Sequence, residues 1–185
     1  YILQICEAHN TTQIVKSKSM VTEEIHLNQF LEAHGIESVE TDLGEYIQQL
    51  DGEAPYHIVT PAMHKSKEDV AKLFHEKLGT PANLSPTELT LVAREKLRSK
   101  YQTAQVGITG ANFWIADVGA ISVTENEGNA RLTTSLPKVH IAIVGIEKVI
   151  PKLKDLNLFL PLLSTFGTGQ KITSYNTIFS GPRQH

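Results

Sequence analysis

Gln13-Ile14-Val15-Lys16-Ser17 is the stretch that decides the fold, because it predicts a strand that is followed at once by a helix. β-Branched residues favour strands. Thr22 is a suitable cap for the helix that follows, and Gly35 is a suitable end for it. Residues 36–41 then predict a second strand. A strand, a helix and a strand in this order predict two parallel strands with the helix packed on one face of the sheet.

The alternation of strands and helices continues through the first half of the chain. Its clearest helix start is Ser85-Pro86-Thr87-Glu88, a capping box with proline at the first helical position. These segments predict a parallel sheet that is covered by helices. The expected segments are a helix over residues 43–50, a strand over 56–60, helices that start at Ser66 and Ser85, and a strand over 105–109.

The second half of the chain predicts a β-rich addition to this sheet. Residues 120–124, 130–136 and 139–144 are strand-like runs that short polar turns separate. A helix over residues 153–166 and a strand over 174–179 follow. We identify no internal repeat and no linker, so residues 1–185 are expected to form one domain.

Composition and charge disfavour nucleic acid and membranes as partners. The chain is 41% hydrophobic and 20% charged, with a formal net charge of −3, so it has no general attraction to phosphate backbones. The longest uncharged run, residues 156–170, is too short to span a bilayer and contains Pro161. The chain starts at Tyr1 with neither an initiator methionine nor a signal peptide, so we interpret it as a fragment of a longer protein.

The single cysteine, Cys6, is insufficient for a disulfide or for an iron–sulfur cluster within this chain. We interpret it as a small apolar residue in a reducing, cytoplasmic compartment. The histidines are scattered and form no metal-binding motif, so no metal site is expected. His140 lies in an apolar strand and is expected to be a core histidine.

The first candidate site lies where the first strand ends, at Lys16, Ser17, Lys18 and Ser19. Two ammonium groups, two hydroxyls and the free amides of a helix start are suited to an anion. The alternative is a solvated edge at which both lysines point into water.

The second candidate site is the turn after the strand that ends at Thr109. Open α/β sheets bind ligands beyond the carboxyl ends of their strands, and Thr109, Gly110 and Asn112 are suited to an oxygen-rich ligand. The alternative is a tight turn in which Asn112 caps a helix.

The third candidate site is Asn126-Glu127-Gly128-Asn129, between two of the strand-like runs. Glu127 is suited to act as a base or a nucleophile if its pKa is shifted. The alternative is a hairpin turn, which clusters of Asn and Gly favour.

Segments along nearly the whole chain carry a resemblance to a known family. They are residues 16–20, 22–25, 40–50, 107–113, 126–129, 145–148, 169–171 and 180–183. By these segments the chain resembles the lactate utilization protein B family, iron–sulfur oxidoreductase subunits built on an LUD domain. One departure follows Ala116, where Asp117-Val118-Gly119 stands in place of the Glu-Thr-Gly frequent in the family and the hydroxyl is lost at Val118.

The resemblance implies a three-layer α/β/α sandwich similar to sugar-phosphate isomerases and CoA transferases. It also implies a role in oxidising L-lactate to pyruvate, as an electron-transport subunit that works with the other subunits of a lactate-oxidising complex. The 4Fe-4S clusters of such proteins belong to a cysteine-rich region outside this chain.

Two functions are therefore open. The domain binds a small organic acid or anchors partner subunits, or it is a CoA-transferase or sugar-phosphate isomerase-like enzyme with Glu127 as its catalytic residue. The expected ligand-binding residues are Lys16, Ser17, Lys18, Ser19, Glu24, Thr109, Gly110, Asn112, Gly128 and Asn129. We expect Lys16, Lys18, Thr109, Asn112, Glu127 and Asn129 to converge on one concave site.

Overall fold

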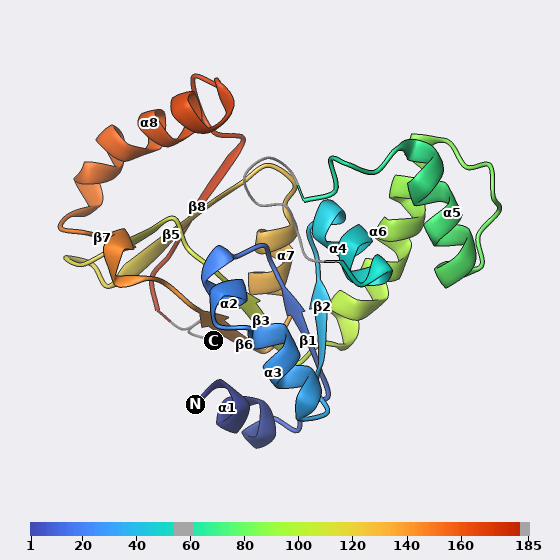
Figure 1. Cartoon of the computed structure of the whole chain (residues 1–185). Coiled ribbons are helices and arrows are strands. Elements are labelled where there is room, and N and C mark those ends of the chain that lie inside the picture. Colours follow the sequence, from blue (N-terminus) through green and yellow to red (C-terminus); the bar gives the residue numbers. More distant parts are fainter. Residues whose placement is uncertain (54–60, 182–185) are drawn as a thin grey trace.

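The computed structural model describes residues 1–53 and 61–181, and its first sheet is parallel throughout (Figure 1). The strand order is β2-β1-β3-β6, as the alternation of strands and helices predicts. The strand expected over residues 56–60 lies outside the described residues. The strands are β1 (Gln13–Lys16), β2 (Glu37–Glu40), β3 (Val106–Thr109) and β6 (Val139–Ala142).

Helices cover both faces of this sheet, which confirms the expected α/β fold with its parallel sheet. Alternate residues of a strand point to opposite faces, so Ile14 packs into one core and Val15 into the other. The core at Ile14 is shared with α1 (Ile2–Ala8) and α3 (Leu27–Ala33), and α2 (Met20–Glu24) lies next to α3. The core at Val15 is shared with α4 (Leu43–Asp51), α5 (Lys67–Leu78) and α6 (Pro86–Thr103).

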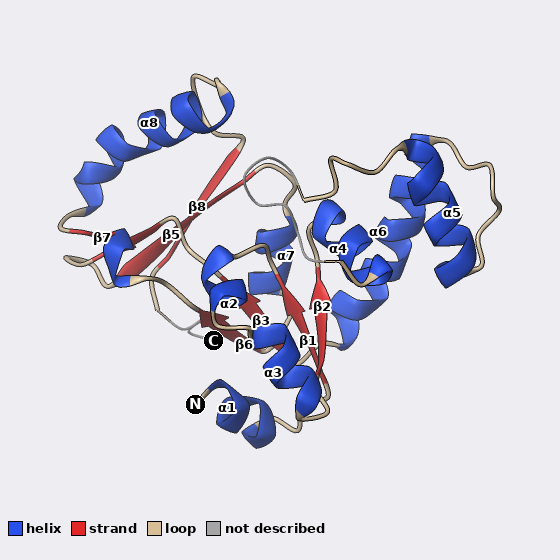
Figure 2. Ribbon diagram, in the orientation of Figure 1, coloured by secondary structure: helices blue, strands red, loops and turns tan. Residues whose placement is uncertain are grey.

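The second half of the chain is β-rich, as expected, but of its described strands only β6 joins the first sheet. The others form a separate second sheet with the strand order β7-β4-β5-β8 (Figure 2). Strand β4 pairs antiparallel with β5 and parallel with β7, and β8 pairs antiparallel with β5. The elements are β4 (Phe113–Ile115), β5 (Ala120–Glu125), β7 (Val149–Ile150), β8 (Tyr175–Phe179), α8 (Leu156–Thr168) and the short 3₁₀ helices η1 (Ile146–Lys148) and η2 (Leu153–Asp155).

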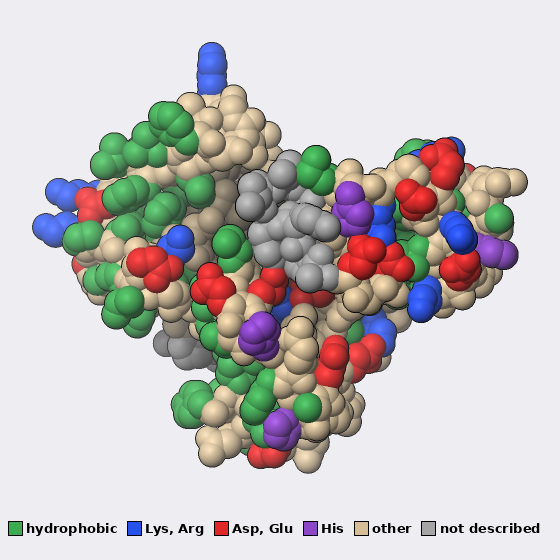
Figure 3. All heavy atoms as spheres, viewed as in Figure 1, with side chains coloured by type: hydrophobic (Ala, Val, Ile, Leu, Met, Phe, Trp, Pro, Cys, Tyr) green, Lys and Arg blue, Asp and Glu red, His purple; other side chains and the backbone are tan. Residues whose placement is uncertain are grey.

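Helix α8 packs on this second sheet through one side and leaves its other side apolar and exposed. Leu156 is buried in the small core that it forms with Ile115 and Ile150. Leu158 and Phe166 are 61% and 82% exposed, and hydrophobic side chains gather over α8 and the second sheet in Figure 3. Within the described residues, no helix has both the length and the apolar character needed to cross a membrane.

The strand expected over residues 130–136 is wrong, because this segment forms helix α7 (Asn129–Ser135). Its two threonines, which suggest a strand by their β-branching, bond instead to carbonyls within the helix. Thr133 donates to Asn129 O and Thr134 to Arg131 O. The carboxylate of Glu125 accepts hydrogen bonds from the Ala130 and Arg131 amides, which stabilises the start of the helix.

Two further expectations about helix starts also differ from the structure. Asn112 caps no helix, because strand β4 follows it directly and its side chain bonds to β5. Thr22 lies inside α2, which Ser19 precedes as the N-cap residue. The helix expected after Thr22 is interrupted at His26, which has a left-handed φ of 52°.

Gly107 allows α7 to pack directly on the centre of the parallel sheet. A Cβ atom at this position would lie 2.0 Å from the carbonyl oxygen of Thr133. The contact therefore requires a residue without a side chain, and it fixes the distance between α7 and β3.

We predict that Gly107→Ala lowers the free energy of unfolding by about 1–3 kcal/mol, because the added methyl group would overlap the backbone of α7. Gly167→Ala is the matched control, since a Cβ atom there meets nothing within 4 Å and the residue lies in α8. Urea denaturation of both variants measures the difference. Equal stability of the two variants would contradict the close contact.

Candidate functional site

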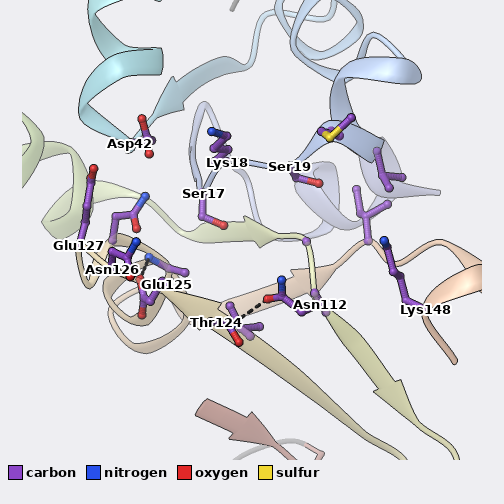
Figure 4. Close-up of a pocket in the computed structure, with 18 residues that line it drawn as sticks. Ser17, Lys18, Ser19, Asp42, Asn112, Thr124, Glu125, Asn126, Glu127 and Lys148 are labelled. Carbon is purple, nitrogen blue, oxygen red and sulfur yellow. Dashed lines mark hydrogen bonds between the residues drawn. The ribbon is translucent and has the colours of Figure 1, made fainter. Parts of the chain in front are cut away.

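A cavity of about 440 Å³ lies at the carboxyl ends of β1, β2, β3 and β6, the described strands of the parallel sheet (Figure 4). The loops after β1, β2, β3 and β6 contribute Lys18, Asp42, Asn112 and Ile143 to its wall. The loop between β5 and α7 contributes Glu127. The position agrees with the rule that open α/β sheets bind ligands beyond the carboxyl ends of their strands.

The loops after β1 and β3 touch each other at Gly110 and Ser19. A Cβ atom on Gly110 would lie 2.9 Å from the Ser19 Oγ atom and 3.2 Å from its Cβ atom, so the two loops approach closely here. Ser17 is held by its amide, which donates to Ile108 O at 3.0 Å. These contacts bring Lys18 and Asn112 to the same cavity.

The cavity has an acidic end and a cationic end. Figure 4 shows Glu125 and Glu127 at one end and Lys148 at the other, with Lys18 between them. Glu125 is bound to the amides at the start of α7, and Asp42 accepts hydrogen bonds from the amides of Gly44 and Glu45. Backbone amides therefore compensate two of the carboxylates in the wall.

Asn112 lines the same cavity as a hydrogen-bond donor. Its Oδ1 atom accepts a hydrogen bond from the Thr124 amide at 2.7 Å, which fixes the orientation of the side chain. This leaves the Nδ2 group to donate towards the cavity. Lys18 is exposed at the mouth of the cavity. Lys148, the last residue of η1, lies on the opposite side of the cavity.

The Glu127 carboxyl has a raised pKa, although much of the residue is exposed. Partial burial is the main cause, and the negative charges of Asp42 and Glu125 act in the same direction. A backbone hydrogen bond from Leu43 and the charge of Lys18 act in the opposite direction. Glu127 therefore holds a proton more readily than an ordinary surface glutamate.

Lys16 does not line the cavity. It is fully buried at the end of β1, where its Nζ atom lies 2.9 Å from Glu40 Oε1 and donates to Thr22 Oγ1 at 3.0 Å. Asn28 Nδ2 donates to the same Glu40 oxygen at 2.7 Å. The charge of Lys16 is thus used inside the protein, which differs from the expected role in holding an anion.

Two further carboxyls adjoin this ion pair and have raised pKa values. Burial is the main cause for both, with the pKa of Glu45 raised to about 9 and that of Glu23 raised to about 7. The charge of Glu40 raises both pKa values further, and Lys16 opposes the shift. Side-chain hydrogen bonds join Glu45 to Glu40 and to Glu23. A protonated Glu45 carries an O–H group that can donate a hydrogen bond to a neighbouring carboxyl oxygen.

The structure brings most of the expected site residues together and leaves four outside the cavity. Besides Lys16, Thr109 is buried and bonds to His140 at 2.8 Å, Glu24 is exposed elsewhere on α2, and Gly128 starts α7 with a left-handed φ of 84°. The expected residues that line the cavity are Ser17, Lys18, Ser19, Gly110, Asn112, Glu127 and Asn129.

Lys148 and Asp42 line the cavity but are absent from the expected set. Both lie in segments that carry the family resemblance, residues 145–148 and 40–50, which is the signal that points to them. The spacing of Asp42 and Lys148 in the sequence does not indicate a shared site, since they follow the ends of β2 and β6, which are far apart in the chain.

The residues of this chain do not fit an iron–sulfur cluster. Cys6 is the only cysteine and is buried in the core beside α3. Cluster ligation usually needs four thiolates. Among residues 1–53 and 61–181, no group of three or more His, Cys, Asp or Glu side chains is arranged to hold a metal ion.

A family model and two similar relatives of this chain agree with one another. A family model for the LUD domain matches residues 1–185. The chain is 51% identical over 185 residues to lactate utilization protein B of Geobacillus thermodenitrificans (strain NG80-2), a match that covers 100% of this chain and 39% of the relative. It is 45% identical over 184 residues to the uncharacterized electron transport protein YkgF of Escherichia coli (strain K12), with the same coverage of 100% and 39%.

One solved structure is also similar. It is the crystal structure of a DUF162 family protein from Deinococcus radiodurans, with 17% sequence identity and a TM-score of 0.35 over 74% of this chain and 84% of that chain. The curated relatives are much longer than this chain, which spans 39% of their length.

We predict that the free energy of unfolding falls as pH rises from about 5 to about 8, with a slope of at most about 1.4 kcal/mol per pH unit for each proton. Glu45 and Glu23 keep their protons in the folded protein and lose them on unfolding, because their folded pKa values lie above the value of 4.5 for a free glutamate. At low pH both carboxyls are protonated in the folded and unfolded states, so they add no pH-dependent cost, and this cost grows as pH rises from 4.5 towards the folded pKa.

Glu45→Gln should make this slope shallower, because the amide has no proton to lose. Urea denaturation at several pH values measures the slope, and Glu32→Gln, at an exposed position on α3, is the matched control. A slope that is the same in Glu45→Gln and in the unsubstituted protein would show that Glu45 is already ionised in the folded state.

Proposed function

The chain belongs to the LUD domain family, and from this membership we propose that it serves lactate utilization as the LUD domain of an electron-transport protein. The names of two relatives support this role, since one is a lactate utilization protein B and the other an electron transport protein. In this proposal, the cavity at the strand ends binds a small organic anion such as pyruvate or L-lactate.

The observation that carries the proposal is that Lys18, Asn112 and Lys148 line one cavity. Two ammonium groups and an amide N–H can together donate charge-assisted and neutral hydrogen bonds to a carboxylate. Asp42 and Glu125 oppose an anion less than their charge suggests, because backbone amides already bind them. The anion therefore binds at the Lys148 end, away from Glu127.

Oxidation of L-lactate to pyruvate is the reaction that we propose for the complex in which this domain works. In this proposal the domain holds the carboxylate of substrate or product, and 4Fe-4S clusters in other parts of the longer protein or in its partner subunits would supply the electron acceptor. Cys6 is the only thiol of this chain and is buried, so these residues do not supply the cluster ligands.

The environment of Glu127 supports a second candidate function, that of an enzyme of the CoA-transferase type. A glutamate with a raised pKa that faces a cavity has the features of a nucleophile or base. Its carboxylate would attack the carbonyl of an acyl thioester and displace the thiolate, which leaves an acyl anhydride on Glu127. We favour the binding domain, because no complete set of catalytic groups accompanies Glu127 among the described residues.

We predict that Lys18→Gln/Lys148→Gln weakens the binding of pyruvate by at least about tenfold, because each lysine supplies a charge-assisted hydrogen bond. Isothermal titration calorimetry with pyruvate and with L-lactate measures the loss. Lys138→Gln is the matched control, since Lys138 is exposed and lies outside the cavity. Lactamide, which has no carboxylate, should not bind. Equal pyruvate affinity in the double variant and the control would refute the anion site.

Incubation of the unsubstituted protein with acetyl-CoA distinguishes the binding domain from the enzyme. We predict no mass adduct on Glu127, and we expect Glu127→Gln to keep most of the affinity for pyruvate. An adduct of acetyl mass that is present in the unsubstituted protein and absent in Glu127→Gln would favour the enzyme.

A further inference from the structure

A second cavity, of about 740 Å³, lies between α6 and α7 and has no role in the proposed function. It is larger than the strand-end cavity and lies within the range of about 300–1,000 Å³ that is usual for small-molecule sites. Its floor is formed by Leu97 and Tyr101 of α6, which are 8% and 5% exposed. The Tyr101 hydroxyl donates to Asn129 O at 3.1 Å, so the floor contains no donor that needs a ligand.

The wall of this cavity that α7 supplies is apolar. Leu132 and Leu136 line it, and both are about half exposed, at 44% and 50%. Leu132 lies in α7 and Leu136 directly follows its last residue. The Leu136 amide donates to Leu132 O at 3.1 Å, so the helical turn continues and the two leucines lie on the same side. An apolar ligand in the cavity would remove this leucine surface from water, which is favourable in proportion to the area covered.

The opposite wall is cationic. Arg94 and Arg98 of α6 line the cavity, and they are also four residues apart on one side of their helix. Neither arginine forms an ion pair within residues 1–53 and 61–181. Guanidinium groups match the planar, bidentate geometry of a carboxylate or phosphate.

Charge and apolar character together define the class of ligand. A purely apolar molecule would leave the arginines unused, and a small anion would leave the leucines exposed. Glu127 lines the cavity as well, and its charge directs an anionic group away from itself and towards the arginines.

We propose that the cavity between α6 and α7 binds an amphipathic anion. Its carboxylate or phosphate group lies on Arg94 and Arg98, and its hydrocarbon part lies against Leu97, Leu132 and Leu136. This site is separate from the lysines of the strand-end cavity, so it stands or falls independently of the proposed binding of pyruvate.

Decanoate and decyl phosphate are suitable probes, with binding followed by amide chemical shifts in NMR spectra. We expect saturable binding that shifts the amides of α6 and α7. Each added methylene from hexanoate to decanoate should tighten binding by about threefold. Arg94→Gln/Arg98→Gln should weaken decanoate binding by at least about tenfold. Lys77→Gln/Lys96→Gln removes the same charge at exposed helix positions outside the cavity and should bind as the unsubstituted protein does.

A second double variant tests the contribution of the leucines to binding and leaves both arginines unchanged. Leu132→Ala/Leu136→Ala should weaken decanoate more than hexanoate, and both side chains are exposed enough for the fold to tolerate the change. Decanol, which has no charge, should bind at least about tenfold more weakly than decanoate. Binding that shifts only the exposed apolar side of α8, equal affinity for decanol, or equal affinity in the arginine variant and its control would each overturn the proposal.

Discussion

The buried ion pair between Lys16 and Glu40 is the interaction on which the rest of this structure depends. It joins the last paired residues of β1 and β2. Thr22 of α2 accepts a hydrogen bond from Lys16, and Asn28 of α3 donates one to Glu40. The Thr22 hydroxyl in turn donates to Ser19 O at 2.7 Å. One charged group therefore fixes two strand ends, α2 and the loop that enters the cavity. Removing either partner alone would leave a charge in the interior, which costs about 3–5 kcal/mol.

The ion pair also explains why the two lysines at the end of β1, Lys16 and Lys18, have different environments. Lys16 belongs to the paired strand and points into the protein, whereas Lys18 follows the last paired residue and is exposed at the cavity. The two lysines therefore have different environments although only one residue separates them. Lys18 lies on a loop whose position Lys16 holds, so in the proposed anion site Lys16 supports the lysine that contacts the ligand. Rigid support of this kind keeps binding groups in place before the ligand arrives.

Local sequence rules were sufficient for much of the fold but not for the contacts that shape the site. The alternation of strands and helices gave the parallel sheet, and strand ends gave the position of the cavity. The helix at residues 129–135 escaped prediction because its threonines favour strands, while the amides at its start depend on a carboxylate from β5. The buried position of Lys16 was not predicted, because its partner, Glu40, lies on another strand and only the register of β1 and β2 brings the two together. Arg94 lies in α6 and Leu132 in α7, two helices that are far apart in the sequence, so neither helix alone predicts the second cavity.

The most direct test of this account is an NMR titration of the lysine side chains, labelled with ¹³C at Cε, with pyruvate. The account predicts that the Lys18 and Lys148 signals move together and saturate at one ligand concentration, while the Lys16 signal stays in place. Movement of Lys16 with no change at Lys18, or no movement of any lysine as pyruvate is added, would contradict it.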